Sequence, residues 1–375
     1  MERQRSTRAG AYVRQLEGYR AFLPAPLPPV PPLELDSAVY RLLSDADRAL
    51  GRLDGAASIL PNPDFFVSMY VRQEAVLSSQ IEGTQSTLKD LLLFESQHTS
   101  NPRSDVDEIV HYVDAMGHGL ERLKTLPLSL RLLREVHERL LATGRGSEKQ
   151  PGEFRRSQNW IGTPGCTLAF ATFVPPPPHE LMRCLGELEA FMHAQNMPPL
   201  LQVALLHAQF ETIHPFLDGN GRIGRLLITL FLCERGILHR PLLYLSVYLK
   251  RHRQQYYDRL MAIRHDGDWE GWVSFFLQGV IEVSQHANDT AQRILHLREE
   301  LRARETSGVG QRMIDLLFET PVVNIPQIAD ALSIAYNTAA STVETFLAEG
   351  DLVEITGQKR NRVYRFERYL TLFEG

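Results

Sequence analysis

The stretch His214-Pro-Phe-Leu-Asp-Gly-Asn-Gly-Arg-Ile-Gly-Arg225 stands between two segments whose apolar residues recur at helical spacing, 199–213 and 221–235. A tight loop between two such helices presents backbone amides at a helix N-terminus, where the helix dipole favours anions. Gly219 and Gly221 let the backbone approach a ligand without a β-carbon in the way. The stretch therefore predicts a helical fold built around an anion-binding loop.

Four side chains in these twelve residues suit a phosphate group. Arg222 and Arg225 are three positions apart, so they share one helix face, and their guanidinium groups match phosphate oxygens. Asp218 is the hard oxygen ligand that Mg²⁺ prefers when phosphate and water complete its shell. His214 can accept a proton near neutral pH. Together they indicate chemistry on a phosphate-bearing substrate.

The stretch resembles, at every fixed position, the signature of the Fic family, which includes Phe216 as a loop anchor. Fic enzymes are all-α proteins that mostly transfer AMP from ATP to a hydroxyl of a target protein, releasing pyrophosphate. The resemblance implies that His214 is the general base on a Ser, Thr or Tyr hydroxyl, and that Asp218 holds Mg²⁺. Arg222 would neutralise the β-phosphate and Arg225 would reach the γ-phosphate. The implied phosphate-binding set is Gly219, Asn220, Gly221, Arg222 and Arg225.

A flap that holds the target protein is expected before the signature. Residues 152–162 resemble the family's approach to this flap, and residues 163–173, followed by four prolines, would form its β-hairpin. By strand addition the flap would lay a target peptide beside the loop. The residues expected to contact the target are Thr163, Thr167 and Phe173.

Tyr256 and Tyr257 resemble the residues that line the adenine pocket in this family. Packing between helices is the alternative role for both rings. The resemblance as a whole covers roughly residues 60–290.

A second motif, Ser78-Ser-Gln-Ile-Glu-Gly83, matches the family's inhibitory helix. The start signal Asn62-Pro63 and the stop at Gly83 predict that helix over 63–83. The resemblance implies that Ser78, Glu82 and Gly83 form the inhibitor, with Glu82 pairing with Arg225 in place of the γ-phosphate. Two alternatives stay open: an ordinary exposed helix pair, or a glutamate that positions water for AMP removal.

The last part of the chain, 308–375, has the pattern of a winged helix-turn-helix domain: three short helical segments followed by two strand-like pieces. Residues 301–375 carry eight basic and ten acidic residues, and the third helical segment, 336–349, has no Lys or Arg. Because phosphate contacts supply most non-specific DNA affinity, a protein-interaction or dimerisation module is favoured over a DNA-binding regulator.

Other function classes fit less well. The Glu211-Thr-Ile-His214 pattern occurs once, whereas dicarboxylate metal sites in helical bundles need it twice. Transfer of a different nucleotide would use the same motif and stays open. The net charge of −5 argues against a surface built throughout for nucleic acid, and no apolar stretch approaches the length of a membrane span.

The expected protein is cytoplasmic and mainly α-helical: a Fic-fold bundle with a small hairpin flap and a C-terminal winged helix. Its expected partners are ATP, a target protein, and a second copy in a homodimer or in self-modification. The expected regions are an extended Pro-rich arm (1–36), an N-terminal helical region (37–110), a catalytic domain (111–300) and the winged helix (308–375).

Overall fold

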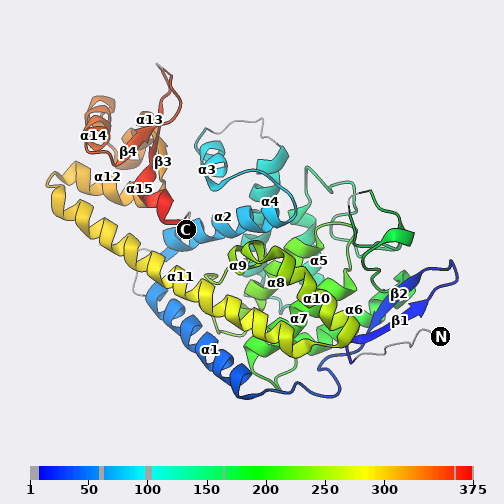
Figure 1. Cartoon of the computed structure of the whole chain (residues 1–375). Helices are drawn as coiled ribbons and strands as arrows, with labels where there is room; N and C mark the ends of the chain where they lie inside the picture. The colour runs from blue at the N-terminus through cyan, green and yellow to red at the C-terminus, as the bar shows by residue number, and fades with distance from the viewer. Residues whose placement is uncertain (1–7, 59–62, 98–103, 164, 359, 374–375) are drawn as a thin grey trace.

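The computed structural model of the chain describes residues 8–58, 63–97, 104–163, 165–358 and 360–373. The fold is mainly helical with small antiparallel sheets, as the sequence predicts (Figure 1). None of the described helices has both the length and the apolar composition that crossing a bilayer requires. The helices are α1(Ser37–Ser58), α2(Pro63–Ile81), α3(Leu88–Gln97), α4(Ser104–Arg122), α5(Leu130–Leu140), α6(Pro178–Met192), α7(Pro199–Ile213), α8(Asn220–Glu234), α9(Ser246–Arg251), α10(Arg253–Asp266), α11(Trp269–Arg304), α12(Gly308–Glu319), α13(Ile325–Leu332), α14(Tyr336–Ala348) and α15(Glu367–Leu370).

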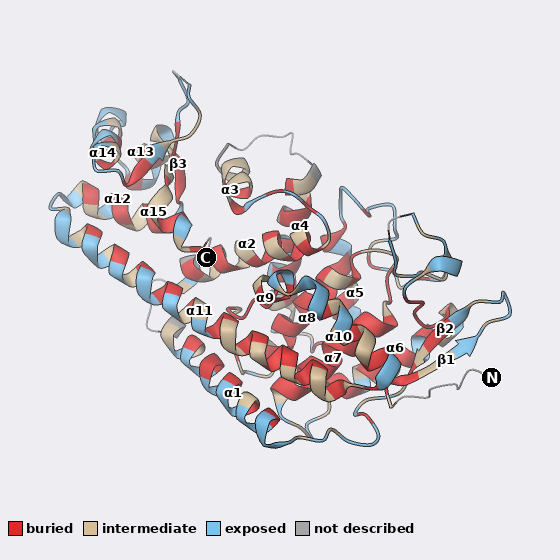
Figure 2. Ribbon diagram, viewed as in Figure 1, coloured by how far each residue is buried: buried red, intermediate tan, exposed pale blue. Residues whose placement is uncertain are grey.

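Helix α7 lies at the centre of the bundle. Every residue from Leu200 to Ile213 is buried, so this helix has no solvent face (Figure 2). Helices α8 and α11 pack against it, and Trp272 of α11 donates a hydrogen bond to the carbonyl of Ala204 (2.8 Å). The loop that joins α7 to α8 is therefore anchored by buried helices at both ends.

Two helices cross the expected limits of the regions. Helix α4 runs across residue 110, where the N-terminal region was expected to meet the catalytic domain. Helix α11 packs along α1 and extends beyond the bundle to α12, so one continuous helix joins the catalytic part to the C-terminal unit (Figure 1).

The N-terminal arm contains a β-hairpin, where the sequence predicts only an extended segment. β1(Gly10–Arg14) and β2(Arg20–Pro24) pair antiparallel along their whole length. Phe22 is buried and its N–H donates to the carbonyl of Val174 (2.9 Å), at the end of the flap. Aromatic and β-branched residues, which favour strands, precede the prolines that dominate the pattern of this arm. The described part of the arm, residues 8–36, is an ordered strap over the fold.

Helix α2 is the helix predicted as inhibitory. It begins at Pro63, and the expected cap residue Asn62 lies outside the described residues. It ends at Ile81, and Gly83 follows with φ 105°, a conformation that glycine adopts readily.

A buried carboxyl group fixes α2 to its neighbours. Glu74 of α2 accepts hydrogen bonds from the hydroxyls of Ser246 (2.5 Å) and Tyr112 (3.1 Å), which belong to α9 and α4. Burial raises the pKa of Glu74 to about 7. Helix α2 is thus held by a polar contact inside the core.

The flap is less regular than the predicted hairpin. One antiparallel bridge, between Ile161 and Phe173, closes the flap, and residues 165–173 contain a short 3-10 turn at Leu168–Phe170. This segment is rich in Gly, Pro and small residues, which form strands poorly. The predicted β-hairpin is therefore wrong in its detail, although the segment does close on itself.

The C-terminal unit combines α12, α13 and α14 with a sheet of order β3-β5-β4. β4(Leu352–Glu354) and β5(Val363–Phe366) are the two predicted strands. β3(Val322–Asn324) was not predicted, because three residues are too few for a recognisable alternation; Val322 lies opposite Arg365 of β5.

The end of the chain packs on α2. The side chain of Gln73 donates to the carbonyl of Phe373 (2.9 Å), and the rings of Tyr70 and Phe373 lie 5.5 Å apart in an edge-on arrangement. Lys89 of α3 lies 3.3 Å from the carboxylate of Glu367 in α15. The C-terminal unit therefore touches the helix that carries the predicted inhibitor (Figure 1).

Candidate active site

His214 adopts the left-handed conformation (φ 50°, ψ 62°) directly after α7. Its N–H donates to the carbonyl of Phe210 (2.9 Å). For a residue with a side chain this conformation costs about 1–2 kcal/mol, so other contacts must hold it. Arg155 Nε and Asn159 Nδ2 both donate to the carbonyl of His214, at 3.0 and 3.1 Å.

Arg155 supports the loop through hydrogen bonds to backbone carbonyl groups. It is buried and also donates to the carbonyls of Pro176 (2.6 Å) and Ile213 (3.3 Å). Burial lowers the pKa of Arg155 to about 10. The sequence singles out residues 152–162 as the approach to the flap, but it does not indicate that Arg155 and Asn159 hold the candidate base.

The imidazole of His214 is arranged as a neutral base. Its Nδ1 is buried without a hydrogen-bond partner among the described residues, which leaves Nε2 as the nitrogen open to a substrate. Burial lowers the pKa of His214 to about 3, and the positive charges of Arg155 and Arg264 add to this effect. The ring is therefore uncharged at neutral pH and free to accept a proton.

Glu211 stands behind His214, with its Oε2 4.0 Å from His214 Nδ1. It is only 6% exposed, and burial raises the pKa of Glu211 to about 7. The absence of a side chain at Gly224 makes room for its Oε1. Among the described residues no three His, Cys, Asp or Glu side chains gather as a metal cage, so Glu211 and His214 lack the further ligands of a dicarboxylate centre.

The loop is shaped by the side chain of Asn220. Its Oδ1 accepts from the N–H of Phe216 and its Nδ2 donates to the carbonyl of Phe216, both at 2.8 Å. These two bonds fix the shape of the loop. The backbone amide of Asn220 and the second N–H of its Nδ2 are the donors left for the predicted phosphate contact.

His137 of α5 gives the loop a second support that the sequence does not indicate. Its ring stacks on Phe216 with 3.7 Å between centroids. Its Nδ1 accepts from the N–H of Gly152 (2.9 Å), so Nε2 donates to the carbonyl of Asp218 (3.1 Å). Burial lowers the pKa of His137 to about 4, which keeps this ring neutral.

The N-terminus of α8 is arranged for an anion. Gly219 precedes the helix with φ 76°, and no side chain caps the first turn. Asn220 and Gly221 begin the helix, so their amides point along its axis at the positive end of the dipole. The N–H of Gly219 itself donates to Oδ1 of Asp218 (2.6 Å), so of the two predicted glycines it is Gly221 whose amide belongs to the first turn of the helix.

Asp218 and Arg222 lie together beside this helix end. The carboxylate of Asp218 is about one third exposed, and its Oδ1 lies 3.5 Å from Arg222 Nη2. Arg222 is buried, with Nη1 3.4 Å from the carboxylate of Glu108, while its Nε and Nη2 have no hydrogen-bond partner among the described residues. Burial lowers the pKa of Arg222. Unsatisfied donors next to an accessible carboxylate suit a phosphate with its cation.

The predicted contact between Glu82 and Arg225 is present. Arg225 Nη2 donates to Glu82 Oε1 (2.7 Å), and Arg225 Nε donates to the hydroxyl of Ser78 (2.7 Å). Burial is the largest single effect and would raise the pKa of Glu82, but the charge and hydrogen bond of Arg225 together with the charge of Arg222 outweigh it, so the pKa is lowered and the side chain is ionised. The ion pair spans 143 residues of sequence.

The two tyrosines predicted for the adenine pocket differ in exposure. Tyr256 is 1% exposed, and its hydroxyl bonds to Nε2 of His207 (2.9 Å), whose Nδ1 faces the carbonyl of Gly224 (2.8 Å). Tyr256 is therefore a core residue and not an accessible pocket wall. Tyr257 is partly exposed and keeps its candidacy.

The flap residues predicted to contact the target also differ in exposure. Thr163 and Thr167 are exposed, whereas Phe173 is 1% exposed and packs under Arg264, whose guanidinium lies 3.8 Å from the ring centroid. The expectation that Phe173 contacts the target is wrong, because burial makes it an anchor. Phe170, 82% exposed on the flap, is an accessible aromatic that no sequence motif indicates.

Comparisons with known proteins agree with this site. A model of the Fic/DOC family matches residues 127–232, and a model of the Fic/DOC family N-terminal region matches residues 40–121. The chain is 33% identical over 151 residues to a protein adenylyltransferase Fic from Culex quinquefasciatus, over 40% of this chain and 27% of that protein. For a protein of the same name from Drosophila yakuba the identity is 28% over 210 residues, covering 52% and 39%. The chain thus spans well under half the length of these curated relatives.

Solved structures share the fold. A Fic family protein from Desulfovibrio desulfuricans G20 superimposes with a TM-score of 0.59 at 19% identity, over 89% of this chain and 97% of that one. A Fic domain containing signaling protein from Bacteroides thetaiotaomicron gives a TM-score of 0.51 at 19% identity, over 68% and 97%. The two family models together match half of the sequence and include the whole catalytic loop, so the chain belongs to the Fic/DOC family.

Proposed function

We propose that this protein transfers AMP from ATP to a Ser, Thr or Tyr hydroxyl of a target protein, or of itself. The observation that carries the proposal is the placing of a neutral His214, with its side chain only 20% exposed, in the loop that leads into the uncapped N-terminus of α8, the helix that also carries Arg225. The relatives named protein adenylyltransferase Fic support the same activity.

The reaction needs one bond made and one broken. The target hydroxyl oxygen attacks the α-phosphorus of ATP, the bond from that phosphorus to the bridging oxygen breaks, and pyrophosphate leaves. His214 Nε2 takes the hydroxyl proton as the new bond forms. The first-turn amides of α8 and the guanidinium groups of Arg222 and Arg225 offset the phosphate charge.

A Mg²⁺ ion that enters with ATP would have Asp218 as its protein ligand. One accessible carboxylate fits the way Mg²⁺ is usually held, with phosphate oxygens and water completing its shell. The ion would neutralise charge on the leaving pyrophosphate. Arg222, 3.5 Å from Asp218, holds that carboxylate in place.

We also propose that Glu82 restrains the enzyme. Its carboxylate accepts a hydrogen bond from the guanidinium of Arg225 that a γ-phosphate would use. The hydroxyl of Ser78 accepts a second hydrogen bond, from Nε of the same guanidinium. ATP that binds beside this ion pair would have its phosphates displaced from the line of attack. The inhibitor belongs to the same chain as the site it restrains.

Transfer of label from ATP labelled at the α-phosphate, with Mg²⁺, tests the activity. The protein, Glu82→Gly and Glu82→Gly/His214→Ala are compared on a gel with and without cell lysate. Label that increases in Glu82→Gly and disappears with His214→Ala supports AMP transfer, the base and the restraint. ATP labelled at the γ-phosphate is the control, because a kinase would transfer that label instead.

The contrary outcome is specific. If folded, ATP-binding Glu82→Gly labels neither itself nor any lysate protein, AMP transfer is wrong. The same preparations are then incubated with a protein carrying AMP on a hydroxyl. Release of AMP that depends on Glu82 would favour removal, with this carboxylate positioning the attacking water.

For the C-terminal unit we propose contact with protein, in preference to DNA. Helix α14 carries no Lys or Arg. Two of the basic residues near the wing are neutralised by acids: Arg365 pairs with Glu367 and Arg368 with Glu300. A gel-shift titration with mixed duplex DNA at physiological salt should show no binding by this chain; micromolar binding would contradict the proposal.

A further inference from the structure

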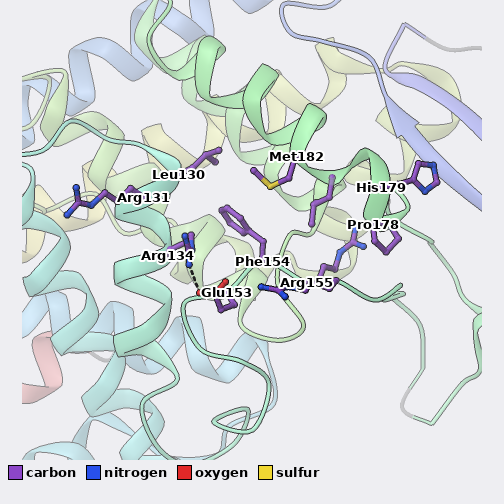
Figure 3. A pocket seen from close by; sticks show the side chains of 11 residues that line it. Leu130, Arg131, Arg134, Glu153, Phe154, Arg155, Pro178, His179 and Met182 are labelled. Carbon is purple, nitrogen blue, oxygen red and sulfur yellow. Dashed lines mark hydrogen bonds and ion pairs between the residues drawn. The ribbon is translucent and has the colours of Figure 1, made fainter.

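A pocket of about 640 Å³ opens between α5, residues 153–156 and α6 (Figure 3). We call it the Phe154 pocket, after the ring that forms part of its wall. It differs from the phosphate site described above, because none of the loop residues 214–222 lines it. Its apolar wall includes Leu130, Phe154 and Met182, and its basic side chains include Arg131, Arg134 and Arg156.

The Phe154 pocket touches the support of the catalytic loop. The ring of Phe154 lies 5.2 Å from that of Phe216, centroid to centroid. Its neighbour Arg155, also a lining residue, donates to the carbonyl of His214 (3.0 Å). One layer of side chains therefore separates a pocket occupant from the residues that hold the base.

The two ends of the flap lie next to residues that line this pocket. Arg156 precedes the flap bridge at Ile161 by five residues, and Pro178 follows the other bridge residue, Phe173, by five. A target segment that pairs with the flap by strand addition would therefore continue into the pocket next to the ends of the flap.

The pocket holds positive charge that the protein does not neutralise. Glu153 is paired with Arg134, and Arg131 is paired with Glu135. Arg156 is exposed and makes no ion pair or hydrogen bond with any residue that the structure describes. A guanidinium beside an apolar wall matches a carboxylate next to a large apolar side chain.

We propose that the Phe154 pocket binds a segment of the protein substrate in which an acidic residue adjoins a large apolar one. Arg156 binds the carboxylate, and Phe154 together with Met182, a residue 58% exposed, covers the apolar side chain. The segment lies beyond the part of the target that follows the flap, and its capture holds the modified hydroxyl near His214. This inference rests on the proposed function, because it assigns the substrate class of the same reaction.

Peptide binding tests the pocket without relying on catalysis. Fluorescein-labelled peptides carrying Glu-Phe, Lys-Phe or Glu-Ala in an otherwise Gly-Ser sequence are titrated with the full chain and followed by anisotropy. The Glu-Phe peptide should bind at least about tenfold more tightly than either of the others, a difference of about 1.4 kcal/mol.

Two pocket variants and one control make the result specific. Arg156→Glu and Met182→Glu should each weaken binding of the Glu-Phe peptide at least about tenfold. Arg183→Glu is the control: Arg183 lies on the same helix, but it pairs with Glu180 and Glu187 and does not line the pocket. That variant should bind the peptide as the unchanged chain does.

Some outcomes overturn the pocket and leave the proposed function standing. One is equal affinity for all three peptides, and another is unaltered binding after Arg156→Glu. Displacement of the Glu-Phe peptide by millimolar inorganic phosphate, with no dependence on Phe, would indicate a general anion site and also overturn the proposal. Loss of AMP transfer itself is read separately, from labelled ATP.

Discussion

The carboxylate of Glu82 lies against Gly221, in the space that a β-carbon at this position would need. The same carboxylate accepts a hydrogen bond from Arg225 (2.7 Å). The side chain of Glu82 therefore rests on the first turn of α8, where the amides would receive the phosphates of a nucleotide. The glycine and the glutamate are matched in shape, so in the proposed restraint Glu82 would occupy room that the phosphates of ATP need.

Replacement of Glu82 by glycine should raise AMP transfer at least about tenfold, because the fork of Arg225 becomes free for the γ-phosphate. The measurement is the initial rate of label transfer at saturating ATP. Gln80→Gly, on the same helix, is the control for loosening the helix end. Equal activation by both substitutions would show that helix flexibility, and not the ion pair, sets the activity.

Asn159→Ala should lower kcat about 10- to 100-fold and leave the KM for ATP nearly unchanged. Its side-chain amide donates to the carbonyls of His214 (3.1 Å) and Phe216 (2.9 Å), and losing such bonds at buried groups costs about 1–3 kcal/mol. Ser157→Ala, a change at an exposed side chain nearby, is the control. A large rise in KM with constant kcat would contradict a role in orienting the base.

Activity should rise with pH through the ionisation of Glu211. His214, with a pKa of about 3, does not titrate between about pH 6 and 8, whereas Glu211 has a pKa of about 7. Ionised Glu211 stabilises the imidazolium that forms on His214; the charged groups acting on Glu211 are Arg225, Arg264 and Glu82.

In the Glu82→Gly background, Glu211→Gln should abolish this rise and lower kcat about tenfold above pH 7. The measurement is the kcat profile of both variants, whose ratio cancels the titration of ATP itself. An unchanged slope in Glu211→Gln would mean that Glu211 only packs behind the base.

The stability of the fold should fall as pH rises from about 4.5 to 7, in part because of Glu74. Burial raises the pKa of this carboxyl to about 7, so the folded state keeps a proton that the unfolded chain has released. The difference amounts to at most about 3 kcal/mol. Urea unfolding of Glu74→Gln at a series of pH values should show a shallower decline, and a slope as steep as in the unchanged chain would refute this account.

Phe373→Ala should partly release the restraint, by a few-fold. Phe373 packs on Tyr70, and its backbone carbonyl accepts a hydrogen bond from the side chain of Gln73. These contacts of the C-terminal unit stabilise the position of α2. The decisive comparison is made in the Glu82→Gly background, where Phe373→Ala should have no further effect. A similar increase in both backgrounds would place its action elsewhere.

Local patterns account for the parts of the fold that the sequence predicts well. The apolar spacing on either side of the catalytic loop marks α7 and α8, because each helix carries its own periodic signal. The N-terminal hairpin and β3 escape prediction, since short strands depend on distant partners for their hydrogen bonds.

In the candidate site, too, the sequence predicts some properties of the residues and not others. The motif predicts His214, Asp218 and Arg225, and the contact of Arg225 with Glu82 follows from the family resemblance. The sequence does not indicate that Asn220 bonds within its own loop or that Phe173 is buried. Those properties depend on which atoms surround each side chain, and a linear pattern does not contain that information.

The sequence by itself determined the type of fold and the residues that can perform chemistry on phosphate, because helical periodicity and a twelve-residue motif are local properties. Only the tertiary structure decided how these residues behave. Arg155 reaches the carbonyl of His214 across 59 positions, and burial gives Glu211 and His214 pKa values far from those of the free side chains. Desolvation and charge act through space, so they arise only once distant segments have come together.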